Sequence, residues 1–255
     1  MKNNWNELEL TLALRLYYQL PFGKMHKGNA EIKKLAQVIN RTPSAVAMKL
    51  GNFARFDTKL RMRNIKGLTN GSKQDLVIWN KFIDLNFLEE ETNKIIVRYN
   101  DSSLLDLFQN EPMVEETSLK SSEIITKGRR KQSFFRKIVL SNYNNCCCIT
   151  GLSCPTLLVA SHIIPWSKNE RERLNPQNRL LLNSIHDKAF DQGLITINFN
   201  YEIILSEIIR KLPKSKFIED TFLSYENKSI SLPDKYLPTE EFIKYHNKYI
   251  FKDTL

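Results

Sequence analysis

Cysteine, glycine and long apolar runs are scarce in this sequence. Its 255 residues include four Cys, eight Gly and four His, and three of the cysteines are consecutive, at positions 146–148. Cysteines in that number and order do not indicate a disulfide framework. There is no stretch of about 18 uncharged apolar residues, which a membrane helix requires, and the first residues do not resemble a signal peptide. We therefore expect a soluble, cytoplasmic protein without a membrane partner.

Positive charge exceeds negative charge, and the excess is concentrated in one segment. The formal net charge is +10. Between Pro21 and Lys81 stand thirteen Lys or Arg and only three acids, whereas between Asp101 and Thr126 six acids face one Lys. A basic block on a folded domain favours a polyanionic partner such as nucleic acid. Ordinary solvation of Lys-rich helices is the alternative explanation.

The N-terminal third has the periodicity of helices. Apolar residues at helical spacing predict helices over residues 5–20, 29–39, 42–53 and 72–88. The first of these would bury one broad face. The fourth would turn four side chains inward, namely Leu76, Trp79, Phe82 and Ile83.

The second and third of these helices are joined by a tight turn and form a helix-turn-helix candidate. Thr42 is the expected N-cap of the third helix, and Pro43 is its first residue. A plain helical hairpin with a solvated face is the alternative. The side chains that we expect to face outward, toward DNA phosphates and base edges, are Arg41, Ser44, Lys49, Asn52 and Arg55.

A change of composition divides the chain. From Glu89 the helical periodicity fades and acids accumulate, which predicts a linker with one short helix at 103–108. Residues 127–140 then contain six basic residues and no acid, and helical spacing resumes from Gln132 to Tyr143. We predict a helical DNA-binding domain at 1–90, an acidic linker at 91–126 and a second domain at 127–255. Candidate phosphate contacts at the start of the second domain are Arg130, Gln132 and Arg136.

The segment from 156 to 193 has the most informative pattern. Residues 156–163 (TLLVASHI) are apolar and β-branched, which predicts a strand that carries His162 near its end and stops before Pro165. Asn178 precedes a second short apolar run at 180–182. Ser184 is the expected N-cap of a helix, with Asp187 three residues later as in a capping box. Gly193 would close that helix.

A strand, a loop, a strand and a short helix, with His162, Asn178 and His186 on successive pieces, resemble the ββα-metal fold of the HNH nucleases. The likeness extends to the branch of bacterial restriction-type HNH endonucleases. Its motifs read here Ser161-His162-Ile163, Pro176-Gln177-Asn178 and His186-Asp187-Lys188-Ala189-Phe190-Asp191-Gln192-Gly193. The N-terminal block is similar to the helical front end of such proteins. The expected fold class is therefore α+β, with a mainly helical N-terminal domain and a C-terminal ββα-metal domain.

The resemblance implies roles for these residues. His162 would be the general base, Asn178 would hold its ring, and His186 would bind a divalent metal ion, with Mg²⁺ expected and Mn²⁺ or Ni²⁺ as substitutes. Many HNH nucleases have Asp or His before the general base, where this chain has Ser161, a poor ligand. The remaining candidates for metal ligands are Asp187 and Asp191. Arg179 follows Asn178 where glycine is more usual, and we list it as a DNA contact.

Structural zinc is not expected. Many HNH proteins carry two Cys-x-x-Cys pairs, but the second pair would fall at 182–185, where this sequence has Leu-Asn-Ser-Ile, and a structural zinc ion needs four N or S ligands. The last part of the chain predicts a hairpin over 194–205 and a helix over 239–251 that packs through Phe242, Tyr245, Tyr249 and Ile250. His246, on that helix, and His26 are interpreted as packing or surface histidines.

These observations favour a metal-dependent endonuclease of restriction type that acts on double-stranded DNA, with a homodimer plausible for double-strand cleavage. The alternative is a non-catalytic DNA-binding regulator whose HNH domain is degenerate, and Ser161 is the feature that keeps this alternative open. An RNA-processing nuclease is less favoured, because the sequence shows no aromatic platform for base stacking.

Overall fold

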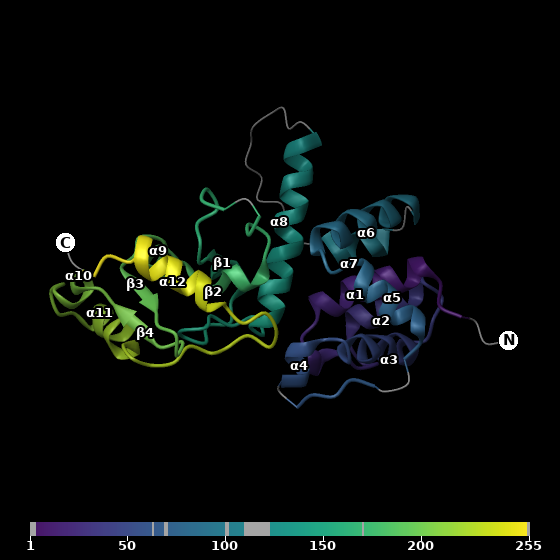
Figure 1. Cartoon of the computed structure of the whole chain (residues 1–255), viewed down its shortest axis with the longest axis horizontal. Coiled ribbons are helices and arrows are strands. Elements are labelled where there is room, and N and C mark those ends of the chain that lie inside the picture. Colours follow the sequence, from purple (N-terminus) through teal and green to yellow (C-terminus); the bar gives the residue numbers. More distant parts are fainter. Residues whose placement is uncertain are drawn as a thin grey trace. The chain divides into compact units, whose positions relative to one another are not determined.

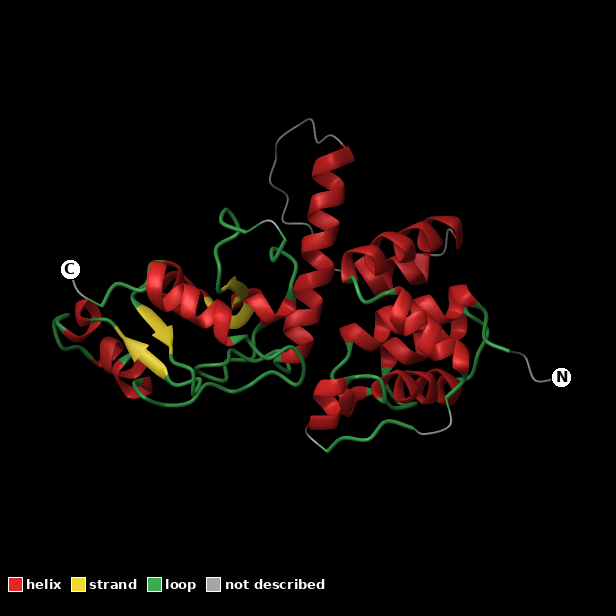
Figure 2. Ribbon diagram, in the orientation of Figure 1, coloured by secondary structure: helices red, strands yellow, loops and turns green. Residues whose placement is uncertain are grey.

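The structure is a computed structural model that describes residues 4–62, 64–68, 71–99, 102–109, 123–169 and 171–253. The chain divides into two compact units, Met1–Ile138 and Val139–Leu255. We call them the N-terminal unit and the C-terminal unit and describe each by itself. Figures 1 and 2 show that the first is helical, whereas the strands belong to the second. No helix in the described part of the chain has the length and apolar character needed to cross a membrane.

The N-terminal unit is built around one helix. α1 (Glu7–Gln19) contacts four other helices, and Leu10, Leu12, Leu14 and Leu16 are completely buried. We predicted that this helix would bury one broad face, but every residue from Glu9 to Gln19 is buried, so the prediction understated its burial. A helix that neighbours surround on all sides loses the usual polar stripe. The surrounding helices are α2 (Ala30–Val38), α3 (Pro43–Ala54), α5 (Lys73–Lys81) and α6 (Leu85–Tyr99).

Helix α5 ends earlier than predicted. The expected single helix over 72–88 is two helices, α5 and α6, because the side chain of Asp84 accepts a hydrogen bond from the Asn86 N–H at the start of α6. A side chain that caps a new helix in this way favours a break in the chain direction. Phe82 is buried as predicted, but Leu76 and Ile83 are exposed, so their predicted inward orientation was wrong.

Helices continue where the sequence predicted a linker. α6 runs to Tyr99, and α7 (Ser102–Gln109) contains the short helix that we predicted at 103–108. Residues 110–122 of the predicted linker lie outside the described part. The last helix of this region, α8 (Glu123–Asn142), contains the boundary between the two units. A short helix, α4 (Thr58–Met62), lies between α3 and α5.

The C-terminal unit contains two small antiparallel sheets. β1 (Leu158–His162) pairs with β2 (Arg179–Asn183), and β3 (Ile195–Ile197) pairs with β4 (Ile203–Leu205). α9 (Ser184–Asp191) follows β2 directly and packs against β1, β2 and β3. This is the predicted order of strand, loop, strand and helix, and the predicted hairpin over 194–205 is confirmed. The core beneath is apolar, with Leu181, Leu182 and Phe190 among its buried side chains.

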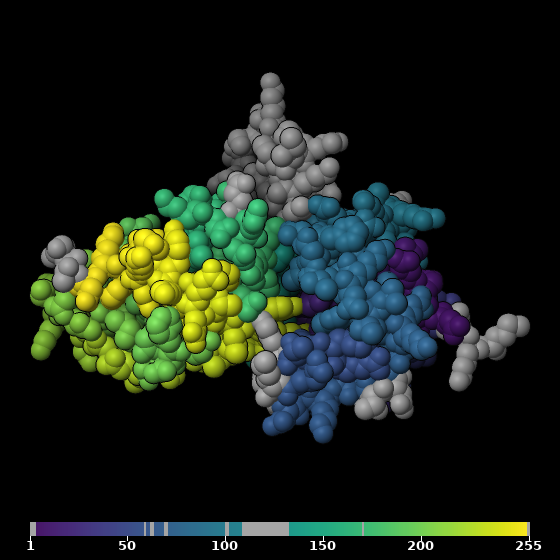
Figure 3. Space-filling model, in the orientation of Figure 1, coloured from purple at the N-terminus to yellow at the C-terminus, as the bar shows by residue number. Residues whose placement is uncertain are grey.

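The remaining helices of the C-terminal unit complete this core. They are α10 (Glu207–Arg210), α11 (Lys216–Thr221) and α12 (Glu240–Tyr249). α12 contributes Phe242, Ile243 and His246 to the interior, whereas Tyr249 is exposed, contrary to the prediction that it packs inward. The opposite side of α12 forms part of the molecular surface in Figure 3.

The turn after α9 requires a glycine. Gly193 has a φ of +71°, and a Cβ at this position would lie 2.0 Å from the carbonyl oxygen of Ile250. Its N–H donates to the Phe190 carbonyl, and the Leu194 N–H donates to the Ala189 carbonyl, so the end of α9 is capped as predicted. The start of α9 differs from the prediction, because Asn183 is the N-cap and Ser184 is the first helical residue.

Candidate active site

His162 is held in one orientation by a main-chain carbonyl. Its Nε2 lies 3.0 Å from the carbonyl oxygen of Arg173. Because a carbonyl can only accept a hydrogen bond, Nε2 must carry the proton, and Nδ1 is left as the acceptor. No residue in the described part of the chain hydrogen-bonds to that Nδ1 atom. The half-buried imidazole therefore presents a free lone pair to a proton donor.

The surroundings of His162 keep it neutral. Burial lowers its pKa to about 4, and the positive charges of Arg179 and Arg173 act in the same direction, against the hydrogen bond to the Arg173 carbonyl, which raises it. The edge of the Trp166 ring packs on the imidazole with a centroid distance of 5.4 Å. At neutral pH the side chain is thus an unprotonated base.

Arg179 lies inside the fold. It pairs directly opposite His162 in the β1–β2 ladder, and its guanidinium donates to the carbonyls of Ala160 and Arg173. The Arg173 carbonyl thus accepts hydrogen bonds from both His162 and Arg179. Because Arg179 is only 6% exposed, its position does not match the expected role as a DNA contact.

Asn178 stabilises the loop between the strands, and among the described residues its side chain bonds to the main chain of that loop and not to the His162 ring. Its Oδ1 accepts from the Ile164 N–H at 2.7 Å, and its Nδ2 lies 3.2 Å from the carbonyl oxygens of Ile164 and of Glu172. The prediction that Asn178 holds the imidazole is therefore corrected. The amide ties together the two ends of the loop that presents the Arg173 carbonyl, so Asn178 acts on His162 only indirectly.

His186 lies in a separate, fully buried environment. It is 1% exposed, its Nδ1 accepts from Asn183 Nδ2 at 2.9 Å, and its Nε2 lies 2.7 Å from the carbonyl oxygen of Thr221. Phe222 and Tyr225 pack against the ring. Since both ring nitrogens are already hydrogen-bonded, His186 does not fit the predicted role of metal ligand.

Two carboxylates stand one turn apart on α9. Burial raises the pKa of Asp187, while the Ser161 hydroxyl and Lys188 lower it. Burial and then the charge of Asp187 raise the pKa of Asp191, although the residue has an exposed surface. Asp187 is not used in the helix cap, contrary to the capping-box prediction, because Asn183 fills that role. Like charges this close favour a counter-ion between them.

Ser161 connects these carboxylates to the strand that bears His162. Its hydroxyl is buried and lacks a hydrogen-bond partner of standard geometry among the described residues, yet it is near enough to Asp187 to lower the pKa of that carboxyl. Within the described ranges, no three His, Cys, Asp or Glu side chains form a cluster that could hold a metal ion. Any ion at this position would therefore need water or phosphate oxygens as additional ligands.

Two of the predicted DNA contacts on α3 are used within the N-terminal unit. Lys49 Nζ lies 2.7 Å from Asp75 Oδ1, and both side chains are almost completely buried. Asn52 Nδ2 lies 3.4 Å from the other oxygen of Asp75. Asp75 also forms a capping box with Ser72 at the start of α5. Lys49 therefore joins α3 to α5 and does not face outward as predicted.

The other predicted contacts differ in exposure. Arg41 forms an ion pair of 2.8 Å with Glu9, and its guanidinium lies over the Trp5 ring. Arg55 is half-buried, whereas Ser44 is exposed. On α8, Arg136 is half-buried, and the side chains of Arg130 and Gln132 lie outside the described part. Among these positions, Ser44 most clearly has the outward orientation that the helical pattern predicts.

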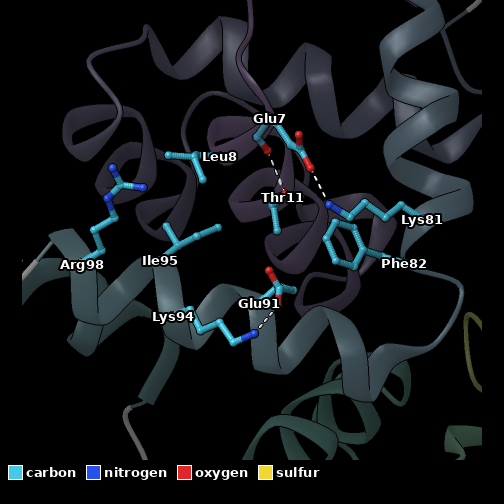
Figure 4. Close-up of a pocket in the computed structure, with 9 residues that line it drawn as sticks. All are labelled: Glu7, Leu8, Thr11, Lys81, Phe82, Glu91, Lys94, Ile95 and Arg98. Atoms are coloured by element: carbon cyan, nitrogen blue, oxygen red, sulfur yellow. Dashed lines mark hydrogen bonds and ion pairs between the residues drawn. The ribbon is translucent and has the colours of Figure 1, made fainter.

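The N-terminal unit also contains a pocket lined by α1, α5 and α6 (Figure 4). Two of its cations are paired with its acids, because Lys81 Nζ lies 2.5 Å from Glu7 and Lys94 Nζ lies 2.6 Å from Glu91. These pairs involve both lysines that line the pocket, and Arg98 is a third cation in its lining; we assign no ligand to it.

Comparison with known families agrees with the placement of the site. Residues 147–198 match the family model described as HNH endonuclease, and this range contains β1, β2, α9 and β3. A search of curated proteins finds no match. Residues 147–198 of the C-terminal unit are therefore similar to the HNH endonucleases, a class of domain that acts on nucleic acid.

The sequence did not identify Arg173 and Trp166 as parts of the site. Trp166 follows Pro165, beyond the predicted strand, and had no assigned role. Arg173 acts through its main-chain carbonyl, and its side chain packs over the Trp166 ring at 5.1 Å while its Nε donates to the Trp166 carbonyl. A main-chain contribution of this kind leaves no residue-type signal that a motif could reveal.

Proposed function

We propose that this protein is a DNA endonuclease of restriction type in which His162 is the general base. The observation that carries the proposal is the single orientation of His162 within an HNH domain, with Nε2 bonded to the Arg173 carbonyl and Nδ1 free. An activated water requires a neutral base close to the scissile phosphate. A pKa of about 4 keeps His162 neutral at physiological pH, although it also makes the imidazole a weaker base.

The metal ion that this activity needs would be held by Asp187 and Asp191. Both provide carboxylate oxygens, which Mg²⁺ prefers, and Mn²⁺ or Ni²⁺ are expected substitutes. Burial, and after it the charge of Asp187, raises the pKa of Asp191, and a cation between the two carboxylates would relieve the second of these effects. When bound, such an ion neutralises charge on the phosphate and on the leaving oxygen. His186 is not included, since both its ring nitrogens are engaged.

The substrate that we propose is double-stranded DNA. The excess of ten positive charges between Pro21 and Lys81 supports binding to phosphates through the N-terminal unit. The exposed position of Ser44 on α3 is compatible with a helix-turn-helix that approaches the major groove. Cleavage of both strands would need two active sites, so we propose a homodimer on DNA. A cytoplasmic location belongs to the same proposal.

Plasmid nicking tests this function directly. Full-length protein is incubated with supercoiled plasmid and Mg²⁺, with and without a chelator, beside the variants His162→Ala and His26→Ala. His26 is exposed and remote in sequence from the site, so its variant is the matched control. We expect cleavage by the wild type and by His26→Ala, and none by His162→Ala or in the presence of the chelator. Cleavage by His162→Ala would refute the assignment of the base.

A non-catalytic DNA-binding regulator is the second candidate. Two observations favour it: Ser161 stands where many relatives have a metal ligand, and His186 is buried with both nitrogens hydrogen-bonded. This candidate predicts salt-dependent DNA binding without nicking under Mg²⁺, Mn²⁺ or Ni²⁺. A mobility-shift measurement on the same preparations separates it from the first candidate, since binding without cleavage supports only the regulator.

A further inference from the structure

Four polar side chains meet where the turn over residues 147–152 packs against the junction of β2 and α9. They are Cys147, Thr150, Asn183 and His186, and we call them the clamp. Asn183 is at its centre. Its Nδ2 lies 2.9 Å from His186 Nδ1 and 3.4 Å from Thr150 Oγ1, and its main-chain N–H donates to the Cys147 sulfur at 3.3 Å.

The thiol of Cys147 is the second point where these side chains converge. Burial raises the pKa of this thiol, but hydrogen bonding with the side chains of His186 and Thr150 and with the main chain of Thr150 and Ile149 outweighs it and lowers the pKa to about 7. Cys147 is completely buried and His186 is 1% exposed. Asn183 thus contacts each of the other three residues, and Thr150 and Asn183 themselves are half-buried.

The clamp adds side-chain hydrogen bonds between elements that main-chain hydrogen bonds and apolar packing already join. The Cys148 N–H donates to the Leu181 carbonyl at 2.8 Å, which fixes the turn to β2. Asn183 Oδ1 accepts from the N–H groups of Ile185 and His186, which starts α9. The same Asn183 side chain thus caps α9 and joins it to the turn. This connection fixes the helix that carries Asp187 relative to β2.

The clamp residues have the sequence spacing that is typical of paired zinc ligands. Cys147 and Thr150 are separated by two residues, as are Asn183 and His186. Two such pairs of Cys or His, brought together by a turn and a helix start, are the usual ligand set of structural Zn²⁺. Here only one member of each pair can serve as a strong ligand, because a hydroxyl and an amide bind zinc poorly.

We propose that the clamp is a latent zinc site in which hydrogen bonds from Thr150 and Asn183 replace the ion. Two substitutions, Thr150→Cys and Asn183→Cys, would complete a set of three thiolates and one imidazole and create a site for one Zn²⁺. The role of His186 is then to hold the turn against α9. This inference does not depend on whether the C-terminal unit cleaves DNA.

Metal binding by a matched pair of variants tests the proposal. The double variant Thr150→Cys/Asn183→Cys is compared with Thr150→Ser/Asn183→Ser, which has oxygen in place of sulfur, and with the wild type. Zn²⁺ affinity is measured by competition with a chromogenic chelator, and the ligand set by the visible spectrum of bound Co²⁺. We expect one ion per chain in the Cys variant, with an affinity at least about 1,000-fold above that of the Ser variant.

The Co²⁺ spectrum of the Cys variant should show the intense bands of tetrahedral thiolate coordination, and zinc should raise its unfolding temperature. After dialysis, the wild type should retain no stoichiometric zinc. Because Asn183→Cys removes the N-cap of α9, the single variant Thr150→Cys, which keeps the cap, is measured in parallel and should bind zinc with intermediate affinity.

Three outcomes would overturn the proposal. One is equal zinc affinity in the Cys and Ser double variants together with no gain in Thr150→Cys, because the four positions would then not converge. Another is a Co²⁺ spectrum without thiolate bands. The third is tightly bound, stoichiometric zinc in the wild type, because the clamp would then not be held by hydrogen bonds alone.

Discussion

The surroundings of His162 and of His186 differ at one nitrogen. In both rings Nε2 is bonded to a main-chain carbonyl, that of Arg173 for His162 and that of Thr221 for His186. In His186 the second nitrogen accepts from Asn183, whereas in His162 it is free among the described residues. Two histidines of one motif can thus have the same tautomer and still differ in whether Nδ1 has a hydrogen-bond partner. Only a free lone pair can accept a proton from water.

The largest expected effect comes from removing the free imidazole. His162→Ala should lower the single-turnover rate of DNA cleavage by about 10²–10⁴-fold, which is the usual contribution of a general base. Its DNA affinity, measured by fluorescence anisotropy, should stay within about twofold of the wild type. Because the ring is only half-buried, the variant should fold. A cleavage rate within tenfold of the wild type would remove the distinction between the two histidines.

The carboxylates of α9 should come next. Asp187→Asn and Asp191→Asn should each lower the cleavage rate by about 10–100-fold and raise the Mg²⁺ concentration needed for half-maximal activity. Glu219→Gln, a change of an exposed acid elsewhere in the C-terminal unit, is the control. If both Asp variants respond to Mg²⁺ as the wild type does, these residues do not hold the ion.

His186→Ala should affect stability more than chemistry. The change leaves the Thr221 carbonyl and the Asn183 amide without partners in a buried site and opens a cavity, so we expect a loss of about 3 kcal/mol in the free energy of unfolding. Urea denaturation followed by circular dichroism measures it. His26→Ala, at an exposed position, should change the free energy by less than about 0.5 kcal/mol. Equal effects of the two substitutions would contradict the buried, hydrogen-bonded role of His186.

Arg179 offers a test of how His162 is held. Arg179→Met keeps the length of the side chain but removes its hydrogen bonds to Ala160 and Arg173. We expect the cleavage rate constant to fall by about tenfold with little change in DNA affinity. The reason is that the Arg173 carbonyl, which orients His162, is no longer held by its hydrogen bond from Arg179. Long-range ¹⁵N–¹H correlation spectra should show His162 as a mixture of tautomers in this variant. A DNA affinity that falls while the tautomer stays fixed would instead favour the original assignment of Arg179 as a DNA contact.

His246 extends the comparison to a third histidine, and its expected effect depends on pH. The side chain is 1% exposed and stacks on the Phe190 ring, with 3.8 Å between the ring centroids. Burial lowers its pKa to about 4, although the hydrogen bond with the Phe190 carbonyl acts in the opposite direction. In the unfolded chain His246 takes up a proton near pH 6.5, whereas in the folded chain it stays neutral down to about pH 4. Its contribution to the free energy of unfolding is therefore complete above pH 6.5. It should fall by at most about 3 kcal/mol between pH 6.5 and 4.

The variant His246→Gln isolates this effect. Urea unfolding at several pH values should show a shallower decline of stability below pH 6.5 than in the wild type. A decline of the same steepness in both proteins would mean that His246 is not the neutral, buried group described here.

Local patterns predicted β1, β2, α9 and the β3–β4 hairpin of the C-terminal unit, whereas α10 and α11 were not predicted. The strand that ends at His162, the run after Asn178 and the turn at Gly193 each follow from residues within a few positions of one another. The N-terminal helices were also predicted, because Thr42 and Pro43 mark a helix start regardless of what packs nearby. The break between α5 and α6 was missed, since Asp84 competes as a cap inside a segment whose apolar spacing continues.

The roles of individual site residues could not be predicted in the same way. His186 is bonded to Thr221, 35 positions away, and Arg179 is turned inward by the Arg173 carbonyl. Lys49 is neutralised by Asp75 on another helix. In each case a distant partner determines whether a polar side chain faces solvent, and no spacing rule contains that information. The motif therefore located the site, whereas tertiary contacts determined which of its residues are free to act.

The most direct test of this account compares two variants in one assay, single-turnover cleavage of plasmid DNA by His162→Ala and by His186→Gln. Rates are corrected for the folded fraction, measured by circular dichroism at the assay temperature. The account predicts that folded His186→Gln cleaves within about tenfold of the wild type while folded His162→Ala is slower by at least about 100-fold. A folded, inactive His186→Gln beside an active His162→Ala would contradict it.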